Sequence, residues 1–127
     1  QSDVLYTDDF ISVYFNNENA FPILCFADDT ACGFMLCKII DVNLPMMQPR
    51  KYIYLDDIAV MPQFRNHGIA SLMLRTLENL AVEKNIDTIE LAVHLTNTNA
   101  LSLYEKFGYA VRTYRMEKKL KPLSQNC

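Results

Sequence analysis

The 127-residue chain has a formal net charge of −3, and 50% of its residues are hydrophobic. This composition is typical of one globular domain with its own core and excludes a fibrous or disordered protein. Basic residues do not cluster before Lys118, so we expect no nucleic-acid partner. No apolar run reaches the roughly 18 residues of a membrane span, and no signal segment opens the chain. We therefore expect a cytoplasmic protein without a membrane partner.

The first half of the chain predicts a short helix and three strands. Residues 7–16 begin with a threonine cap and continue with apolar residues at helical spacing. Two apolar strands, 21–29 and 31–42, form a hairpin through a tight turn. Two prolines keep 43–50 out of regular structure, and 51–61 is a third strand rich in Ile, Tyr and Val.

The third predicted strand carries two acids in its middle. Side chains alternate between the two faces of a strand, so Asp56 is expected on the same face as Ile58 and Val60. Asp57 is expected on the opposite face. The two acids are therefore predicted to have different surroundings.

The second half alternates helices and strands. Gly68 precedes a core-facing helix that Lys84 and Asn85 close. A strand at 87–95, a helix at 97–107 and a last strand at 109–120 follow. The pattern predicts an α/β fold with a mixed sheet, helices on both faces and a parallel pair where a helix connects neighbouring strands.

The four cysteines lack the spacing of a metal site. No CxxC pair and no supporting histidine cluster accompanies them, so they are predicted to be reduced core thiols. We therefore expect no metal. These cysteines are Cys25, Cys32, Cys37 and Cys127.

The segment between the third strand and the following helix suits an anion. The first N–H groups of a helix have no intrahelical acceptor and point beyond its start. Gly68 leaves room for a bulky phosphate, Ala70 is small, and Arg65 can add a charge-assisted contact. The GK[ST] of a nucleotide P-loop and the glycines of a dinucleotide fingerprint are both absent. From this segment alone, a simple N-cap and a solvated arginine explain the pattern equally well.

Two motifs together resemble the GNAT superfamily of acyl-CoA-dependent N-acyltransferases. Residues 65–70 are similar to its pyrophosphate loop, [RQ]xxGx[GA], and residues 97–108 to its NxxAxxxYxxxG helix. The resemblance covers residues 21–119. It implies a mainly antiparallel mixed sheet with a central splayed parallel pair, in a single domain over 1–127. Relative to that pattern the first strand and first helix look missing, so N-terminal truncation is expected.

The resemblance also implies a cosubstrate, acetyl-CoA, and the residues that bind it. Backbone groups of the third strand would pair with the pantetheine arm, and residues 65–71 would hold the pyrophosphate. Tyr104 would protonate the departing thiolate, although a core aromatic residue is the alternative. The implied binding residues are Ile58, Ala59, Val60, Arg65, Asn66, His67, Gly68, Ile69, Ala70, Ser71, Asn97, Tyr104 and Lys106.

An amine acceptor needs a base, because an alkylammonium has a reference pKa near 10.4. The segment "YLDDIAVM" is similar to spermidine and spermine acetyltransferases, which have a glutamate where this chain has Asp56. Asp56 is therefore the favoured base, acting through a water. Asp57, Glu90 and His94 are the other candidates.

Two functions remain open from the sequence. The first is direct acetyl transfer in a ternary complex, to a small cationic amine or to a protein amine. The second is a non-catalytic acyl-CoA-binding module or partner subunit. The acceptor and the oligomeric state are not fixed by the sequence, and a homodimer is possible.

Overall fold

A computed structural model describes residues 19–122. The described chain divides into two compact units, with the boundary along the sequence between Ala92 and Val93, and each unit is described by itself. The helix expected at 7–16 lies outside the described residues. The single domain over 1–127 stays a prediction.

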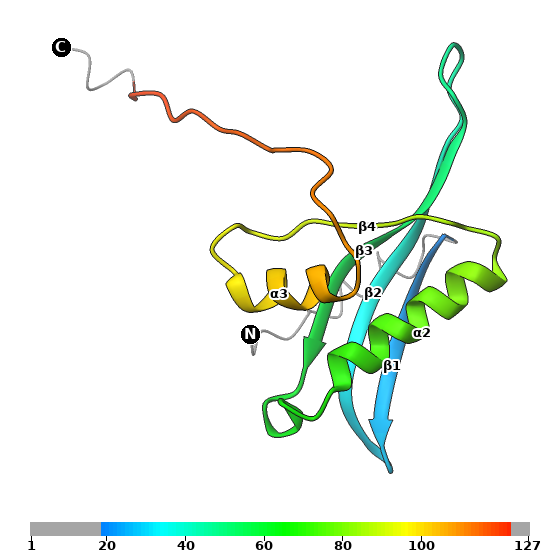
Figure 1. The fold of residues 1–127 in the computed structure, drawn as a ribbon, viewed down its shortest axis with the longest axis vertical. Coiled ribbons are helices and arrows are strands. Elements are labelled where there is room, and N and C mark those ends of the chain that lie inside the picture. Colours follow the sequence, from blue (N-terminus) through cyan, green and yellow to red (C-terminus); the bar gives the residue numbers. More distant parts are fainter. Residues whose placement is uncertain (1–18, 123–127) are drawn as a thin grey trace. The chain divides into compact units, whose positions relative to one another are not determined.

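The first unit is built on a four-stranded sheet in the order β1-β2-β3-β4 (Figure 1). β1, β2 and β3 are antiparallel neighbours, and β4 runs parallel to β3. This confirms the mixed, mainly antiparallel sheet with a parallel pair. The strands are β1 (Ala20–Ala27), β2 (Thr30–Val42), β3 (Arg50–Val60) and β4 (Ile89–Leu91).

Helix α2 (Ile69–Glu83) lies across one face of this sheet (Figure 1). It begins after Gly68 and ends at Lys84, and Asn85 then takes a positive φ of 59°. Both boundaries confirm the prediction. The apolar stripe of the helix is buried against the strands because its members recur every three or four residues. Its buried residues are Met73, Leu74, Leu77 and Ala81.

A β-bulge interrupts the pairing of β2 with β3. Leu36 pairs with Asp57, but the next residue, Cys37, pairs with Leu55, so Asp56 has no residue directly opposite. Directly opposed residues share a face of the sheet, and Leu36 and Cys37 lie on opposite faces. Asp57 and Leu55 therefore lie on opposite faces, although they are two residues apart.

The bulge makes the predicted faces wrong for residues 57–60. Ile58 pairs with Met35 and Val60 with Gly33. A Cβ at Gly33 would touch side chains of α2, so this is the face that the helix covers. One extra residue in a strand shifts its two-residue period, which moves Ile58 and Val60 to the α2 face.

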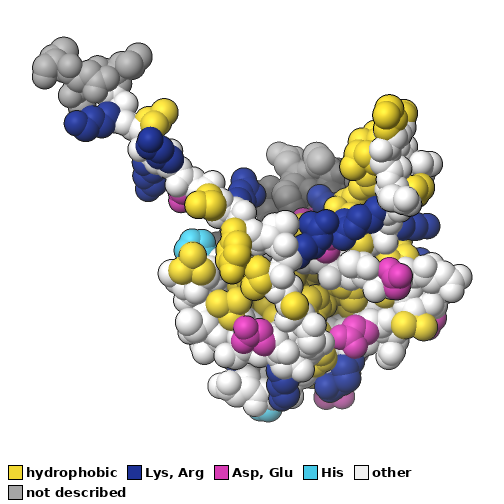
Figure 2. All heavy atoms as spheres, turned by 45° about the horizontal axis from the view of Figure 1, so that its top comes forward, with side chains coloured by type: hydrophobic (Ala, Val, Ile, Leu, Met, Phe, Trp, Pro, Cys, Tyr) yellow, Lys and Arg dark blue, Asp and Glu magenta, His cyan; other side chains and the backbone are white. Residues whose placement is uncertain are grey.

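The β2–β3 hairpin extends beyond its neighbouring strands. β1 pairs with β2 only as far as Lys38, and β4 pairs with β3 only over Ile53–Leu55. The turn between these strands carries no regular structure, as its prolines predict. Hydrophobic side chains gather on it (Figure 2), and Leu44, Met46 and Met47 are exposed there.

The second unit contains helix α3 (Thr98–Lys106), followed by an extended tail. Asn97 caps the helix and Gly108 follows it with a φ of 91°, as predicted. Neither α-helix in the described range 19–122 is long and apolar enough to cross a bilayer.

Two predicted strands differ from the structure. The strand expected at 87–95 is limited to Ile89–Leu91, and residues 109–120 form no strand. Residues 109–120 are extended and almost entirely exposed, and they pair with none of the four strands described within residues 19–122. The prediction was wrong because β-branched and aromatic residues favour extended backbone, whereas a strand also needs a partner.

Replacing Gly33 with alanine should destabilise the first unit by about 1–3 kcal/mol. The new Cβ would lie 3.0 Å from the backbone oxygen of Ala59 and 3.0 Å from Cε of Met73. The methionine can move, but the strand oxygen cannot move without disturbing β3. Alanine is otherwise favoured over glycine inside a strand. A denaturation midpoint equal to or above that of wild type would show that the sheet and α2 are packed less closely here.

Candidate functional site

The start of α2 presents backbone donors beside open space. The first intrahelical bond runs from the N–H of Leu72 to the carbonyl of Gly68, 3.0 Å away. The N–H groups of Ile69, Ala70 and Ser71 therefore have no acceptor within the helix, and no side chain caps it. A Cβ at Gly68 would meet no atom within 4 Å. This geometry can receive an anion such as a phosphate.

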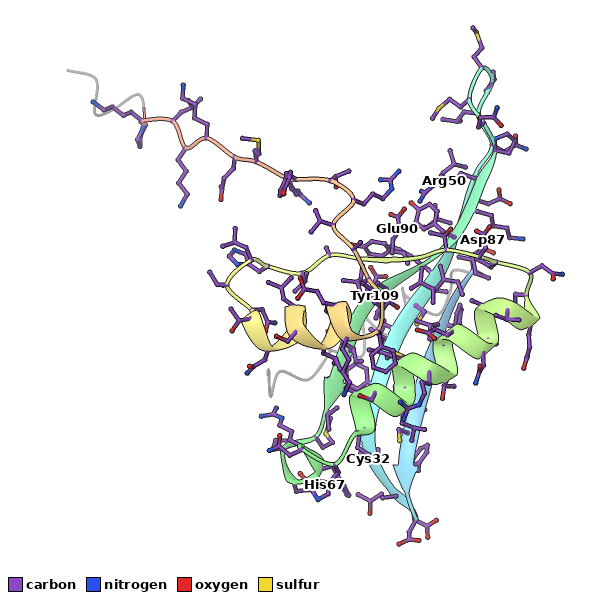
Figure 3. The ribbon with its side chains drawn as sticks, in the orientation of Figure 1. Cys32, Arg50, His67, Asp87, Glu90 and Tyr109 are labelled. Atoms are coloured by element: carbon purple, nitrogen blue, oxygen red, sulfur yellow. The ribbon has the colours of Figure 1, made fainter. Side chains whose placement is uncertain are left out.

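The loop before α2 is tied to the end of β3. Nε of Arg65 donates to the carbonyl of Val60, 3.3 Å away. Nδ1 of His67 lies 3.1 Å from the carbonyl oxygen of Phe64, and His67 lies in the loop that leads into α2 (Figure 3). Asn66 has a positive φ of 66°, which turns the chain toward the helix. Residues 65–68 are thus held beside the first turn of α2.

The backbone of β3 beyond the bulge is bonded to side chains. The N–H of Ile58 donates to Oδ1 of Asp57, 2.8 Å away, and the carbonyl of Val60 accepts from Arg65. Burial raises the pKa of the Asp57 carboxyl, and the hydrogen bond from Ile58 partly opposes that rise. The pairing of this backbone with a pantetheine arm stays a prediction. Ala59, between the two groups, is buried.

Asp56, the unpaired residue of the bulge, is joined to a lysine that the sequence analysis missed. Oδ2 of Asp56 lies 3.4 Å from Nζ of Lys38. Lys38 is directly opposite Tyr54, and its Nζ lies 6.0 Å from the centre of that ring. A single charge inside the apolar run of β2 was the signal that could have identified Lys38.

The other two candidate bases have partners of their own. The Glu90 carboxylate on β4 is paired with the Arg50 guanidinium on β3 (Figure 3). The guanidinium carbon lies 4.2 Å from the centre of the Tyr52 ring. In the second unit, Nδ1 of the exposed His94 lies 2.8 Å from Oγ1 of Thr96. Glu90 and His94 are thus each bonded to a neighbouring side chain.

The second unit holds the helix of the second motif. Oδ1 of Asn97 accepts from the N–H of Ala100 at 3.2 Å, which is an N-cap bond. Tyr104 is buried, and its ring packs edge-on against Tyr109 with 5.7 Å between the ring centres. Lys106 lies in the last turn of α3. Roles for these residues in cofactor binding stay predictions.

The described cysteines are core thiols, as expected. Cys32 and Cys37 are buried, Cys25 is half-buried, and all three are free. Burial, with a smaller contribution from the Asp56 carboxylate, raises the pKa of Cys37 to about 12. Such a thiol is not an activated nucleophile at neutral pH. Cys127 lies outside the described residues.

Comparison with known proteins identifies the family. Residues 2–109 match the acetyltransferase (GNAT) family. The uncharacterised N-acetyltransferase YdgE of Bacillus subtilis is 35% identical over 74 residues, which are 58% of this chain and 47% of that protein. The thialysine N-epsilon-acetyltransferase of Caenorhabditis elegans is 37% identical over 59 residues, or 46% of this chain and 37% of that protein. The matched segments span less than half the length of these two relatives.

A solved structure supports the same fold. The crystal structure of a variant of the BH1408 protein of Bacillus halodurans superposes with a TM-score of 0.84. It is 21% identical, and the match covers 95% of this chain and 78% of that one. The pyrophosphate-loop motif, the mixed sheet and the family match agree, and the chain belongs to the GNAT acetyltransferase family.

Proposed function

We propose that the chain is the catalytic part of an N-acetyltransferase that transfers acetyl from acetyl-CoA directly to a primary amine. The start of α2 carries this proposal. Its three N–H donors, at Ile69, Ala70 and Ser71, lie beside the open space at Gly68. The relatives named as N-acetyltransferases support the same activity.

The pyrophosphate of acetyl-CoA would be held by the first turn of α2. Two phosphates carry more acceptor oxygens than these N–H groups need, and the helix dipole favours their negative charge. The Arg65 guanidinium can add a charge-assisted bond worth about 1.5–3 kcal/mol. Asn66 and His67 would line the entrance to this loop.

The pantetheine arm would bind along β3 from Ile58 to Val60. Both terminal backbone groups of this segment are bonded to side chains, Asp57 and Arg65, which can turn away from them. An arm amide could then replace the carboxylate at the N–H of Ile58 and the guanidinium at the carbonyl of Val60. The Arg65 guanidinium would then move from the carbonyl of Val60 to the pyrophosphate.

The transfer itself needs one base and one acid. The amine nitrogen attacks the thioester carbonyl, the C–S bond breaks, and the acetyl group stays on nitrogen as an amide. Asp56 would accept the ammonium proton through a water, and Tyr104 would donate a proton to the departing thiolate. Since the described cysteines are buried or half-buried core thiols, no acetyl-enzyme intermediate is proposed.

A non-catalytic acyl-CoA-binding module is the second candidate. Its support is that Asp56 and Glu90 both form ion pairs within the protein. An assay of thiol release from acetyl-CoA over a panel of amines separates the two functions. A binding module would bind CoA without releasing thiol in response to any amine.

The proposed cofactor loop is tested by Gly68→Asn and Gly68→Asp. Both side chains have nearly the same shape, and both residue types tolerate the positive φ of 76° at this position. Only aspartate places a negative charge beside the pyrophosphate. We expect CoA to raise the melting temperature of wild type and of Gly68→Asn, whereas Gly68→Asp should bind CoA at least about tenfold more weakly.

Pantetheine is the matched ligand for this pair, because it has the arm but no pyrophosphate. It should bind the two variants equally. Equal binding of CoA by two folded variants would contradict the assignment of the loop.

A further inference from the structure

A β-bulge in the β1–β2 hairpin brings two cysteines together. Cys25 pairs with Gly33, but the next pair along the hairpin skips Cys32, which is the extra residue of the bulge. Sγ of Cys32 donates to the carbonyl oxygen of Cys25, 3.3 Å away. The thiol of one strand therefore lies against the cysteine of the other.

The two thiol groups also contact each other. The pKa of Cys25 is raised, first by burial and then by a hydrogen bond with the Cys32 side chain. Because a bulge breaks the alternation of a strand, Cys32 can share a face of the sheet with Cys25. That face is the one that α2 covers, since Cys25 is directly opposite Gly33, where an added Cβ would touch the helix.

The spacing of the two residues suits a disulfide. Adjacent strands lie about 4.7–4.9 Å apart, and the Cα atoms of a disulfide are usually about 4.4–6.8 Å apart. The Cys32 thiol has to turn only from the carbonyl oxygen of Cys25 to the sulfur of the same residue. Both thiols are free in this structure, so the pair is described in its reduced form.

We propose that Cys25 and Cys32 form a reversible disulfide with hydrogen peroxide as the oxidant, and that this disulfide locks the β1–β2 hairpin. Cys25 is half-buried whereas Cys32 is only 1% exposed, so peroxide reaches Cys25 first. The Cys25 sulfur attacks one peroxide oxygen, the O–O bond breaks, and a sulfenic acid and one water result. The Cys32 sulfur then displaces the hydroxyl as a second water. Two thiols are oxidised and one peroxide is reduced.

The disulfide ties β1 to the part of β2 that holds the loop before α2. The carbonyl of Cys32 accepts from the N–H of Met61, 2.8 Å away, and Met61 directly precedes residues 62–68 of that loop. Cys32 thus lies close to the start of the loop (Figure 3). A cross-link between residues 25 and 32 restricts the unfolded chain, so the oxidised protein is the more stable form.

Mass spectrometry after peroxide treatment and alkylation of the remaining thiols tests the pair. Trypsin releases the three described cysteines on one peptide, which ends at Lys38. In wild type and in Cys37→Ala this peptide should lose two hydrogen atoms, and dithiothreitol should restore them. In Cys25→Ala and in Cys32→Ala it should lose none. Cys37 is the matched control, because it is buried on the same strand but its partners in the sheet are not cysteines.

Thermal melting tests the lock. Oxidation should raise the melting temperature of wild type and of Cys37→Ala by at least about 4 °C and leave that of Cys25→Ala unchanged. Wild-type thiols that stay reduced, or that gain oxygen without joining, overturn the proposal, as does a disulfide that still forms in a folded Cys32→Ala. A disulfide in wild type that does not raise the melting temperature overturns the lock. None of these measurements depends on acetyl transfer, so they test the pair independently of the proposed function.

Discussion

Asp56→Asn should lower acetyl transfer at neutral pH by about 10²- to 10⁴-fold. At pH 7 only about one alkylamine molecule in a few thousand is unprotonated, because the ammonium has a reference pKa near 10.4. Asparagine keeps the shape of the aspartate side chain but cannot take the proton. Initial rates of thiol release at saturating acetyl-CoA measure the loss.

The pH dependence of this variant separates base catalysis from a structural effect. As the pH rises toward the pKa of the amine, the solution itself supplies free amine. The rate of Asp56→Asn should then approach that of wild type. A deficit that is constant from pH 7 to pH 10 would show that Asp56 positions the acceptor without accepting its proton.

Asp57→Asn is the matched control. The amide oxygen of asparagine can still accept the N–H of Ile58, so the strand should keep its shape beyond the bulge. Burial raises the pKa of the Asp57 carboxyl in the folded state. The protonated Asp57 carboxyl therefore contributes its full stabilisation at low pH. This stabilisation is lost as the pH rises through the pKa that the group has in the folded state.

The control variant should thus be at least as stable as wild type at pH 7, and the difference should disappear in acid. Its activity profile should follow that of wild type. If Asp57→Asn loses the activity and Asp56→Asn keeps it, the base is Asp57 and not Asp56.

The sequence predicted α2 and α3 well because the signals that bound these two helices are local. Gly68 and Asn85 adopt positive φ at the two ends of α2, and Asn97 caps α3 through its own side chain. These effects act within one turn of the chain and need no distant partner. The uncapped first turn of α2 was predictable for the same reason.

The faces of β3 were not predictable, because a bulge is a property of two strands. Nothing in "YLDDIAVM" shows that Leu36 and Cys37 pair with residues two apart. The bulge changes the site. It places Ile58 and Val60 on the face that α2 covers, whereas Asp56 forms an ion pair with Lys38. The absent strand at 109–120 has a similar origin, because its apolar residues favour extended backbone but do not provide a neighbour.

Tyr104→Phe should lower the turnover rate by about 10²- to 10⁴-fold with little change in CoA affinity. The substitution removes only the hydroxyl, so the ring can keep its edge-on contact with Tyr109 and α3 should remain folded. Without a proton donor, the sulfur has to leave as a thiolate. The measurement is single-turnover acetyl transfer, together with CoA binding and the melting temperature.

Two controls make this experiment specific to protonation of the thiolate. Tyr109→Phe removes the same group from the neighbouring ring and should turn over at close to the wild-type rate. An alkyl thiol has a pKa near 8.5, so protonation of the leaving group matters less above that pH. The deficit of Tyr104→Phe should therefore narrow as the pH rises from 7 to 9.5. A Tyr104→Phe variant that turns over at the wild-type rate would leave Tyr104 as a core aromatic residue, and the thiolate would then take its proton from water.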